Sequence, residues 1–279
     1  MARKKTSTFA DIAPLFLASR QVSDTHRRRV MAIAARAGRL TTQSLNAYLL
    51  ARIEKVSGFA VKTERSICLT LWRWAYDQGH YDVAPRGVMR MKARRKPTRA
   101  WTVEQIRQIL DACDRQGKRA MWSGATARDF LRCWVLLAYE TGARMGDVFA
   151  FRGDQLDGDT IAWTQSKTGD PLTRTLTPAC LLAVRAMLAK SPDGSILGWV
   201  CSKRQATRRM RQLLESCGFD GSSKWLRRSG ATHCEMAQAG AGRLHLGHRS
   251  PALFESNYCD WAQLRTRTPR PPSLVGDEQ

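Results

Sequence analysis

Three side chains in the stretch Trp225–Asp260 have the chemical types needed to act on a phosphodiester. Arg227 opens an amphipathic segment, His248 lies in a break between two helical patterns, and Tyr258 follows ten residues later. A tyrosine hydroxyl has a pKa of about 10, so at neutral pH it attacks phosphorus only with a base nearby. It also needs donors on the phosphate oxygens. Arginine suits this role because its planar guanidinium stays protonated and binds a phosphate through two hydrogen bonds.

Taken singly, each of these residues also has a purely structural interpretation. Arg227 is one cation in a basic chain, His248 is compatible with an ordinary loop histidine, and Tyr258 with a half-buried aromatic residue of a helix. A second group of polar residues, far upstream, favours the chemical interpretation.

This second group lies in the segment Leu136–Leu156. An apolar helical pattern ends at Gly142, Arg144 follows at once, and Asp147 comes three residues after it. A residue at the start of a helix has backbone amides beside it, and these favour an anion. Asp147 either forms a salt bridge with Arg144 and nothing more, or orients its guanidinium. We expect the second.

In this order, the motifs resemble those of the tyrosine recombinases, also called the phage integrase family. That family has a TGxR arginine with an acid three residues later, a hairpin lysine, an HxxR box, an LGH box and a C-terminal tyrosine. The resemblance covers most of residues 100–262 and, less closely, the N-terminal part. The residues that it assigns to catalysis are Arg144, Lys167, Lys224, Arg227, His248 and Tyr258. One departure is Lys224, which stands where the HxxR box has its histidine, and His245 is only a weak substitute.

The resemblance implies a site-specific DNA recombinase that cleaves and rejoins strands through a covalent 3′-phosphotyrosyl intermediate. Tyr258 would attack the scissile phosphate, Arg144 and Arg227 would neutralise its non-bridging oxygens, and His248 would donate to one of them. Lys167 would protonate the leaving 5′-oxygen. The covalent bond conserves the energy of the cleaved linkage, so no cofactor is expected. No metal is expected either, because arginine and lysine supply the positive charge.

The resemblance also implies the partners: double-stranded DNA with a specific recombination site, and a homotetramer assembled on that DNA in the cytoplasm. The two domains would clamp opposite sides of the duplex. Two alternatives stay open. A type IB topoisomerase shares the chemistry but religates the original strands as a monomer. A non-catalytic DNA-binding relic would have an incomplete site, and only Lys224 supports it.

Composition agrees with a nucleic-acid partner. The 279 residues carry a formal net charge of +22, which favours binding to a polyanion.

No segment approaches about 18 uninterrupted apolar residues, so no membrane-spanning helix and no membrane partner are expected, and the N-terminus lacks the pattern of a signal peptide. The eight cysteines form no CxxC and lie mostly among apolar neighbours, which is typical of reduced, buried thiols rather than a zinc site.

The helical patterns divide the chain into domains. Residues 1–92 should form a helical DNA-binding domain, because residues 1–99 hold 21 Lys and Arg against 6 Asp and Glu. Residues 93–99 should form a basic linker, and residues 100–279 a catalytic domain with an irregular tail from Pro269. The N-terminal helices are expected at Phe9–Ala18, Asp24–Ala37, Thr42–Ile53 and Val61–Gln78.

The catalytic domain is expected to be mixed α/β. The alternation in Thr160–Thr177 predicts a β-hairpin with Lys167 at its turn. The expected helices are Thr102–Cys113, Phe130–Glu140, Pro178–Lys190, Lys203–Cys217 and Ala252–Trp261. We therefore expect a mainly α fold with a small β-sheet (α+β).

Overall fold

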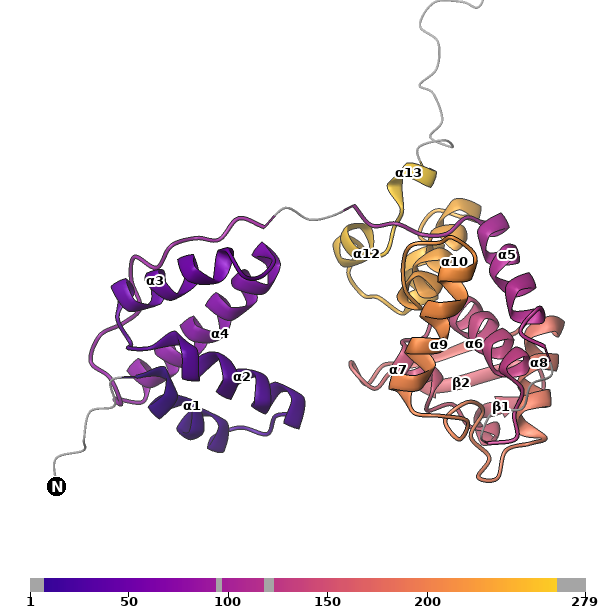
Figure 1. Ribbon diagram of the computed structural model, residues 1–279, viewed down its shortest axis with the longest axis horizontal. Coiled ribbons are helices and arrows are strands. Elements are labelled where there is room, and N and C mark those ends of the chain that lie inside the picture. The colour runs from indigo at the N-terminus through magenta and orange to yellow at the C-terminus, as the bar shows by residue number, and fades with distance from the viewer. Residues whose placement is uncertain (1–7, 94–96, 118–122, 265–279) are drawn as a thin grey trace, which may run out of the picture. The chain divides into compact units, whose positions relative to one another are not determined.

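The structure, a computed structural model, describes residues 8–93, 97–117 and 123–264. The chain divides into two compact units, Met1–Lys96 and Pro97–Gln279 (Figure 1). Residues 94–96 of the predicted linker and the predicted tail from Pro269 lie outside the described residues. The expected α+β class is confirmed, because helices dominate and one small antiparallel sheet accompanies them.

The first unit is a four-helix bundle. Its helices are α1 Phe9–Ala18, α2 Asp24–Ala37, α3 Thr42–Ile53 and α4 Gly58–Asp77. The first three match the bounds expected from the sequence. Helix α4 begins three residues earlier than expected, because Ser57 caps it by accepting a hydrogen bond from the N–H of Ala60 at 3.3 Å. The apolar faces of all four helices pack into one core that includes Phe9, Leu45 and Trp72.

One of the few acidic residues of this unit, Glu64, forms hydrogen bonds in its interior. Glu64 of α4 is buried and accepts hydrogen bonds from Tyr48 at 2.6 Å and from Arg52 at 2.8 Å. The Arg52 guanidinium lowers the pKa of the Glu64 carboxyl. Because Glu64 and Arg52 neutralise each other, the excess of cations among the other residues of the bundle is unchanged.

The second unit contains the remaining elements. Its helices are α5 Val103–Asp114, α6 Ala127–Thr141, α7 Met145–Val148, α8 Pro178–Leu188, α9 Lys203–Ser216, α10 Lys224–Ala237, α11 Ala241–Leu246, α12 Pro251–Asn257 and α13 Trp261–Leu264. A short 3-10 helix, Gly153–Gln155, precedes the sheet. Helix α6 is buried nearly all round, as expected from its apolar sequence, and packs against α5, α8 and α10. It is therefore the centre of the unit.

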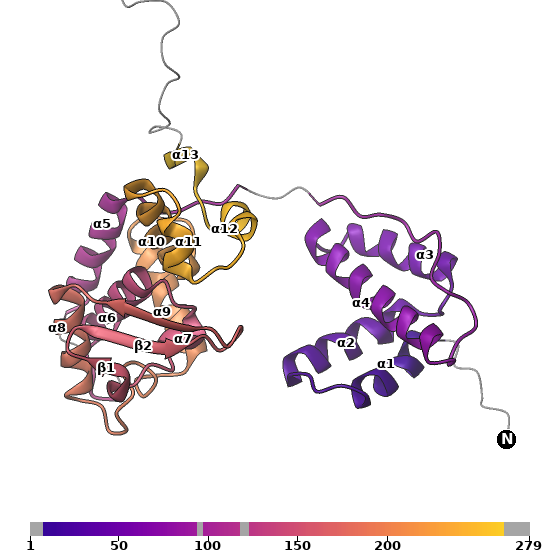
Figure 2. The ribbon, with the colours of Figure 1, turned by 180° about the vertical axis from the view of Figure 1, so that it is seen from behind.

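The sheet lies against one side of the helices (Figure 2). Its strands β1 Leu156–Asp157, β2 Thr160–Thr164 and β3 Pro171–Thr175 are antiparallel and in the order β1-β2-β3. The predicted hairpin is confirmed: Ile161 pairs with Arg174 and Trp163 with Leu172, which leaves Lys167 in the connecting turn. Gly169 completes this turn with a φ of 72°, a left-handed conformation that favours glycine.

All eight cysteines are free thiols, and five of them are buried. No helix within the described residues is both long and apolar enough to cross a membrane.

Helices α6 and α10 approach so closely that their contact requires a glycine. A Cβ added at Gly230 of α10 would lie 2.2 Å from the carbonyl oxygen of Tyr139 in α6. Backbone cannot move aside as a flexible side chain can, so the crossing distance depends on this glycine. The contact also sets the position of Arg227, which lies one turn earlier on α10.

We expect Gly230→Ala to lower the free energy of unfolding by about 1–3 kcal/mol, the usual cost of overpacking a core. Gly146→Ala is the matched control, because nothing lies within 4 Å of its added Cβ and its backbone is helical. That variant should be neutral or slightly more stable. Urea unfolding followed by tryptophan fluorescence compares the two, and equal midpoints would contradict the proposed contact.

Candidate active site

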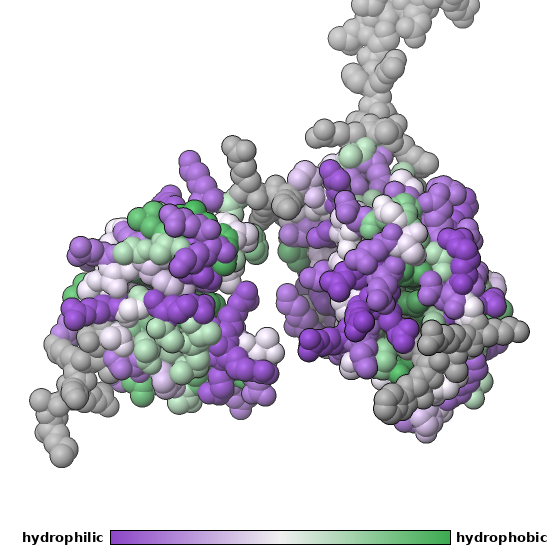
Figure 3. Space-filling view, viewed as in Figure 1, coloured by the Kyte–Doolittle hydropathy of each residue, from purple (hydrophilic) through white to green (hydrophobic). Residues whose placement is uncertain are grey.

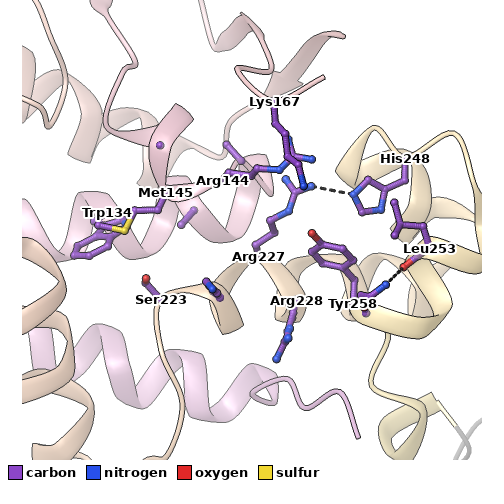
Figure 4. A pocket seen from close by; sticks show the side chains of 15 residues that line it. Trp134, Arg144, Met145, Lys167, Ser223, Arg227, Arg228, His248, Leu253 and Tyr258 are labelled. Atoms are coloured by element: carbon purple, nitrogen blue, oxygen red, sulfur yellow. Dashed lines mark hydrogen bonds between the residues drawn. The ribbon is translucent and has the colours of Figure 1, made fainter. Parts of the chain in front are cut away.

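The six side chains assigned from the sequence line a single pocket of about 630 Å³ in the second unit (Figure 4). They come from four separate segments: the start of α7, the β2–β3 turn, helix α10, and the segment from the end of α11 to the end of α12. These residues are Arg144, Lys167, Lys224, Arg227, His248 and Tyr258. Arg228, which the sequence did not single out, also lines the pocket, but in Figure 4 its side chain points away from Arg144 and Arg227.

Arg227, in the first turn of α10, is the most buried of the six, with only 5% exposed. Its Nη1 donates to the carbonyl of Gly142. Its Nη2 donates to the carbonyl of Leu246 and to Nε2 of His248, each at 3.3 Å. Burial lowers the pKa of Arg227 to about 10, so the guanidinium remains charged at neutral pH. These bonds use three of its five N–H groups.

His248 is a neutral imidazole in this site. Burial, and then the positive charges of Arg227 and Arg144, lower the pKa of His248 to about 4. Because a guanidinium can only donate, Nε2 of His248 accepts from Arg227, which assigns the ring proton to Nδ1. Nδ1 has no hydrogen-bond partner in the described part of the chain. The imidazole therefore retains one unused N–H donor.

Tyr258 lies against both of these residues. Its ring centroid is 4.7 Å from that of His248 and 5.3 Å from Cζ of Arg227. In Figure 4 its hydroxyl points toward the Arg227 guanidinium. The expectation that Tyr258 lies within a helix spanning Ala252–Trp261 was wrong. Helix α12 ends at Asn257, Tyr258 is its C-cap residue, and α13 is a separate short helix.

The backbone around Tyr258 leaves the helix because other residues hold it. The hydroxyl of Thr232 in α10 donates to the Tyr258 carbonyl at 3.3 Å and accepts from the N–H of Asp260 at 3.2 Å. The buried Asp260 carboxylate in turn accepts from the N–H of Ala100 at 2.9 Å. The segment that carries the tyrosine is thus tied to α10 and to the first residues of its own unit.

Arg144 precedes α7 as its N-cap residue, because Gly142 ends α6 in a left-handed conformation with a φ of 60°. Its Nη1 donates to Oε1 of Gln165, a buried residue directly after β2. The expectation that Asp147 orients this guanidinium was wrong. Asp147 instead accepts from the backbone N–H of Ser166 at 3.1 Å and from its hydroxyl at 2.5 Å.

The two hydrogen bonds from Ser166 give Asp147 a different role from the expected one. It ties α7 to the residue directly before Lys167, so it holds the hairpin turn against the helix that follows Arg144. A spacing of three residues cannot distinguish these two roles, because either partner is within reach of a carboxylate on the first turn of a short helix.

Lys167 and Lys224 are both exposed at the edge of the pocket. Lys167 extends from the hairpin turn toward the two arginines (Figure 4). Lys224 is the first residue of α10, three residues before Arg227. His245, considered as a substitute for Lys224, does not line the pocket. Its Nε2 lies so close to Gly142 that an added Cβ there would be 2.6 Å away, which places the ring between α6 and α11.

Because His245 is buried, it makes the free energy of unfolding depend on pH. Desolvation, with the charges of Arg174 and Arg227, lowers the pKa of His245 to about 4. The unfolded chain, with a histidine pKa of about 6.5, therefore binds more protons between these two values. The free energy of unfolding should fall as pH falls through this window.

We expect wild type to lose at least about 1 kcal/mol more than His245→Gln between pH 7 and pH 5, because the glutamine cannot take up the proton. Urea unfolding at both pH values measures this difference. His26→Gln, at an exposed histidine of the first unit, is the control and should follow wild type. Parallel pH dependence in wild type and His245→Gln would contradict the prediction.

Comparison with known proteins finds matches by structure but none by sequence. No family model and no curated protein matches this sequence. Among solved structures, a lambda integrase dimer bound to a COC′ core site matches with a TM-score of 0.75 and 19% identity, covering 96% of this chain and 79% of that one.

Two further structures match at lower identity. The Tn1549 transposon integrase in complex with circular intermediate DNA has a TM-score of 0.67 and 13% identity, covering 95% of this chain and 100% of that one. The XerH site-specific recombinase bound to palindromic difH substrate has a TM-score of 0.65 and 14% identity, covering 81% and 70%. The fold implied by the motif resemblance is thus confirmed, and the protein has the fold of the tyrosine recombinases and integrases.

Proposed function

We propose that the protein is a site-specific DNA recombinase that cleaves and rejoins DNA strands through a 3′-phosphotyrosyl bond to Tyr258. The observation that carries this proposal is the convergence of six side chains from four separate segments on one pocket. A tyrosine between a buried arginine and a neutral histidine, beside a second arginine and two lysines, has the groups that a phosphodiester needs for displacement. The known structures of this fold that are bound to DNA add support.

The two arginines would stabilise the phosphate in the transition state. Arg144 and Arg227 donate to the two non-bridging oxygens, and in Arg227 two N–H groups are not used by the protein bonds described above. Such donors act on the charge that develops as phosphorus becomes five-coordinate, and losing one typically costs about 10²–10³ in rate. His248 would also donate to the phosphate, for which its ring must turn, because the unpaired Nδ1–H is buried.

The remaining groups would manage the bonds that form and break. The Tyr258 hydroxyl gives its proton to solvent in the open pocket, and its oxygen bonds to phosphorus as the bond from phosphorus to the 5′-oxygen breaks. Lys167 gives a proton to that leaving oxygen. Lys224, as a cation at the pocket edge, would stabilise charge in place of the histidine found in the family. In the reverse reaction a 5′-hydroxyl attacks the phosphotyrosyl bond, so rejoining needs no other energy source.

We propose double-stranded DNA with a specific recombination site as the partner, and a homotetramer as the assembly on it. The lambda integrase has been solved both as a dimer on a core site and as a tetramer on a Holliday junction, and one chain of the latter structure matches 98% of this chain at a TM-score of 0.74.

A basic hollow beside the pocket would extend the contact along the DNA backbone. It is lined by Arg204, Gln205, Thr207, Arg208 and Arg211 of α9 and has a volume of about 620 Å³. Thr207 touches Met145 of the pocket at 3.8 Å, so the two hollows are neighbours. Hydrophilic side chains gather over α9 in Figure 3. A strand whose scissile phosphate occupies the pocket could bring adjacent phosphates to these arginines.

The tyrosine assignment is tested with a pool of nicked duplexes of randomised sequence, since the recombination site is unknown. A nick near the cleavage point lets the released fragment diffuse away, which traps the covalent complex. We expect wild type to form a denaturation-resistant adduct with a subset of sequences, and mass spectrometry to place the nucleotide on Tyr258. Tyr258→Phe should form none.

Tyr139→Phe is the matched control for Tyr258→Phe. Tyr139 bonds to Nδ1 of His233 at 2.8 Å and does not line the pocket, so this variant should form the adduct normally. An adduct on another residue, or one that persists in Tyr258→Phe, would overturn the proposed chemistry.

The contact along α9 is tested by the salt dependence of binding. Arg208→Ala should weaken binding to all DNA sequences about equally and reduce the slope of log affinity against log salt by about one. Arg185→Ala removes an exposed cation of α8 that lines neither hollow and should leave the slope unchanged. Fluorescence anisotropy over a series of salt concentrations gives both slopes. If Arg208→Ala kept the wild-type slope of log affinity against log salt, α9 would not be part of the DNA interface.

A further inference from the structure

We propose that Gln165 is a positioning residue that sets the distance between the two phosphate-binding arginines. This inference rests on the function proposed above, since it concerns the same pocket. Gln165 does not line that pocket and would not touch the substrate. It acts from behind the site, through the side chain of Arg144 on one side and the carbonyl that holds Arg227 on the other.

Gln165 is only 2% exposed, and both ends of its amide are bonded. Its Oε1 accepts from Nη1 of Arg144, and the Thr168 hydroxyl donates to the same oxygen at 3.3 Å. Its Nε2 donates to the carbonyl of Leu246 at 3.0 Å. A buried amide with donor and acceptor both used holds its partners in one geometry, because breaking either bond leaves a buried polar group unpaired.

The Leu246 carbonyl is the shared point of this network. It also accepts from Nη2 of Arg227 at 3.3 Å. Arg144, near the start of α7, and Arg227, on α10, are therefore connected through one side chain and one carbonyl. Movement of either guanidinium away from the other would break a bond to Gln165 or to Leu246.

The backbone near Leu246 is shaped to admit this side chain. Gly247 has a φ of 65°, and a Cβ added there would lie 2.7 Å from Nε2 of Gln165 and 2.6 Å from Leu172. Gln165 can therefore reach the Leu246 carbonyl only because the following residue, Gly247, has no side chain. Arg174 of β3 supports the same segment, since its Nη2 donates to the carbonyls of Leu244 and His245 at 2.6 and 2.7 Å.

The chemistry of the two partners selects an amide at this position. Arg144 can only donate and a backbone carbonyl can only accept, so the bridging side chain must accept at one end and donate at the other. A carboxylate would lack the donor and would also bring a negative charge that competes with the phosphate for Arg144. A methionine of similar length would fill the space without either bond.

Gln165→Met is therefore the informative variant, because it keeps the buried volume and removes both bonds. We expect covalent adduct formation, measured in single turnover on a site selected from the nicked pool, to slow at least about 10-fold. Arg144→Ala, which removes a donor outright, should lose about 10²–10³. Thr164→Ala, at the adjacent exposed residue of β2, is the matched control and should cleave at the wild-type rate.

A substrate with a methylphosphonate at the scissile position separates positioning from general distortion. This group lacks one charged non-bridging oxygen, so a misplaced arginine matters less on it. Gln165→Met and Arg144→Ala should both recover most of their loss, and on the same methylphosphonate stereoisomer. A loss in Gln165→Met that is equal on phosphate and methylphosphonate, or no loss on either, would overturn the inference.

Binding of inorganic phosphate tests the inference without any cleavage. Phosphate should raise the Tm of wild type and of Thr164→Ala beyond the effect of chloride at the same ionic strength, by binding the folded state. The increase should be smaller in Gln165→Met and in Arg144→Ala than in wild type, although Arg227 and the arginines of α9 remain in both variants. An equal increase in wild type and Gln165→Met would overturn the inference. If wild type formed no adduct while these phosphate shifts held, the proposed function would fail and the role of Gln165 would remain.

Discussion

A buried cation without an acidic partner is the constraint on which the site depends. Arg227 is 5% exposed, and the described residues place no carboxylate within ion-pair distance of it. Its bonds go to the carbonyls of Gly142 and Leu246, at the C-terminal ends of α6 and α11. Helix C-termini carry partial negative charge, so these ends stabilise the guanidinium without neutralising it. The positive charge therefore remains available for an anion.

Close backbone approaches make this placement possible. Arg227 reaches the end of α6 only because Gly230, one turn later, lets α10 lie against the carbonyl of Tyr139. Gly142 and Gly247, both in left-handed conformations, end the two helices and expose the carbonyls that Arg227 binds. A side chain on Gly230 or Gly142 would push α10 or α11 away from α6, and one on Gly247 would clash with Gln165 and Leu172 of the hairpin. The geometry of the pocket is thus part of the packing of the core.

The β2–β3 hairpin connects the upstream and downstream parts of the site. Asp147 holds its turn through Ser166, and Gln165 links Arg144 to Leu246. Arg249, next to His248, bonds to Asp170 at the other end of the turn at 2.5 Å. A small sheet at the side of a helical unit therefore positions residues that are about a hundred positions apart in the chain, while its turn presents Lys167 at the pocket edge.

Much of this was determined by the sequence alone. Local periodicity and caps located the helices of the bundle, α5 and the hairpin, and the ordered motifs identified the six pocket residues and the fold. The tertiary structure decided the roles that depend on partners distant in the chain. Asp147 turned from Arg144 to Ser166, and Tyr258 left its helix because Thr232 holds the backbone on either side of Cys259. Gln165 looked like any polar residue of an alternating strand, because its two partners lie 21 and 81 positions away. Hydrogen bonds between distant segments leave no periodic trace, so only the folded chain reveals them.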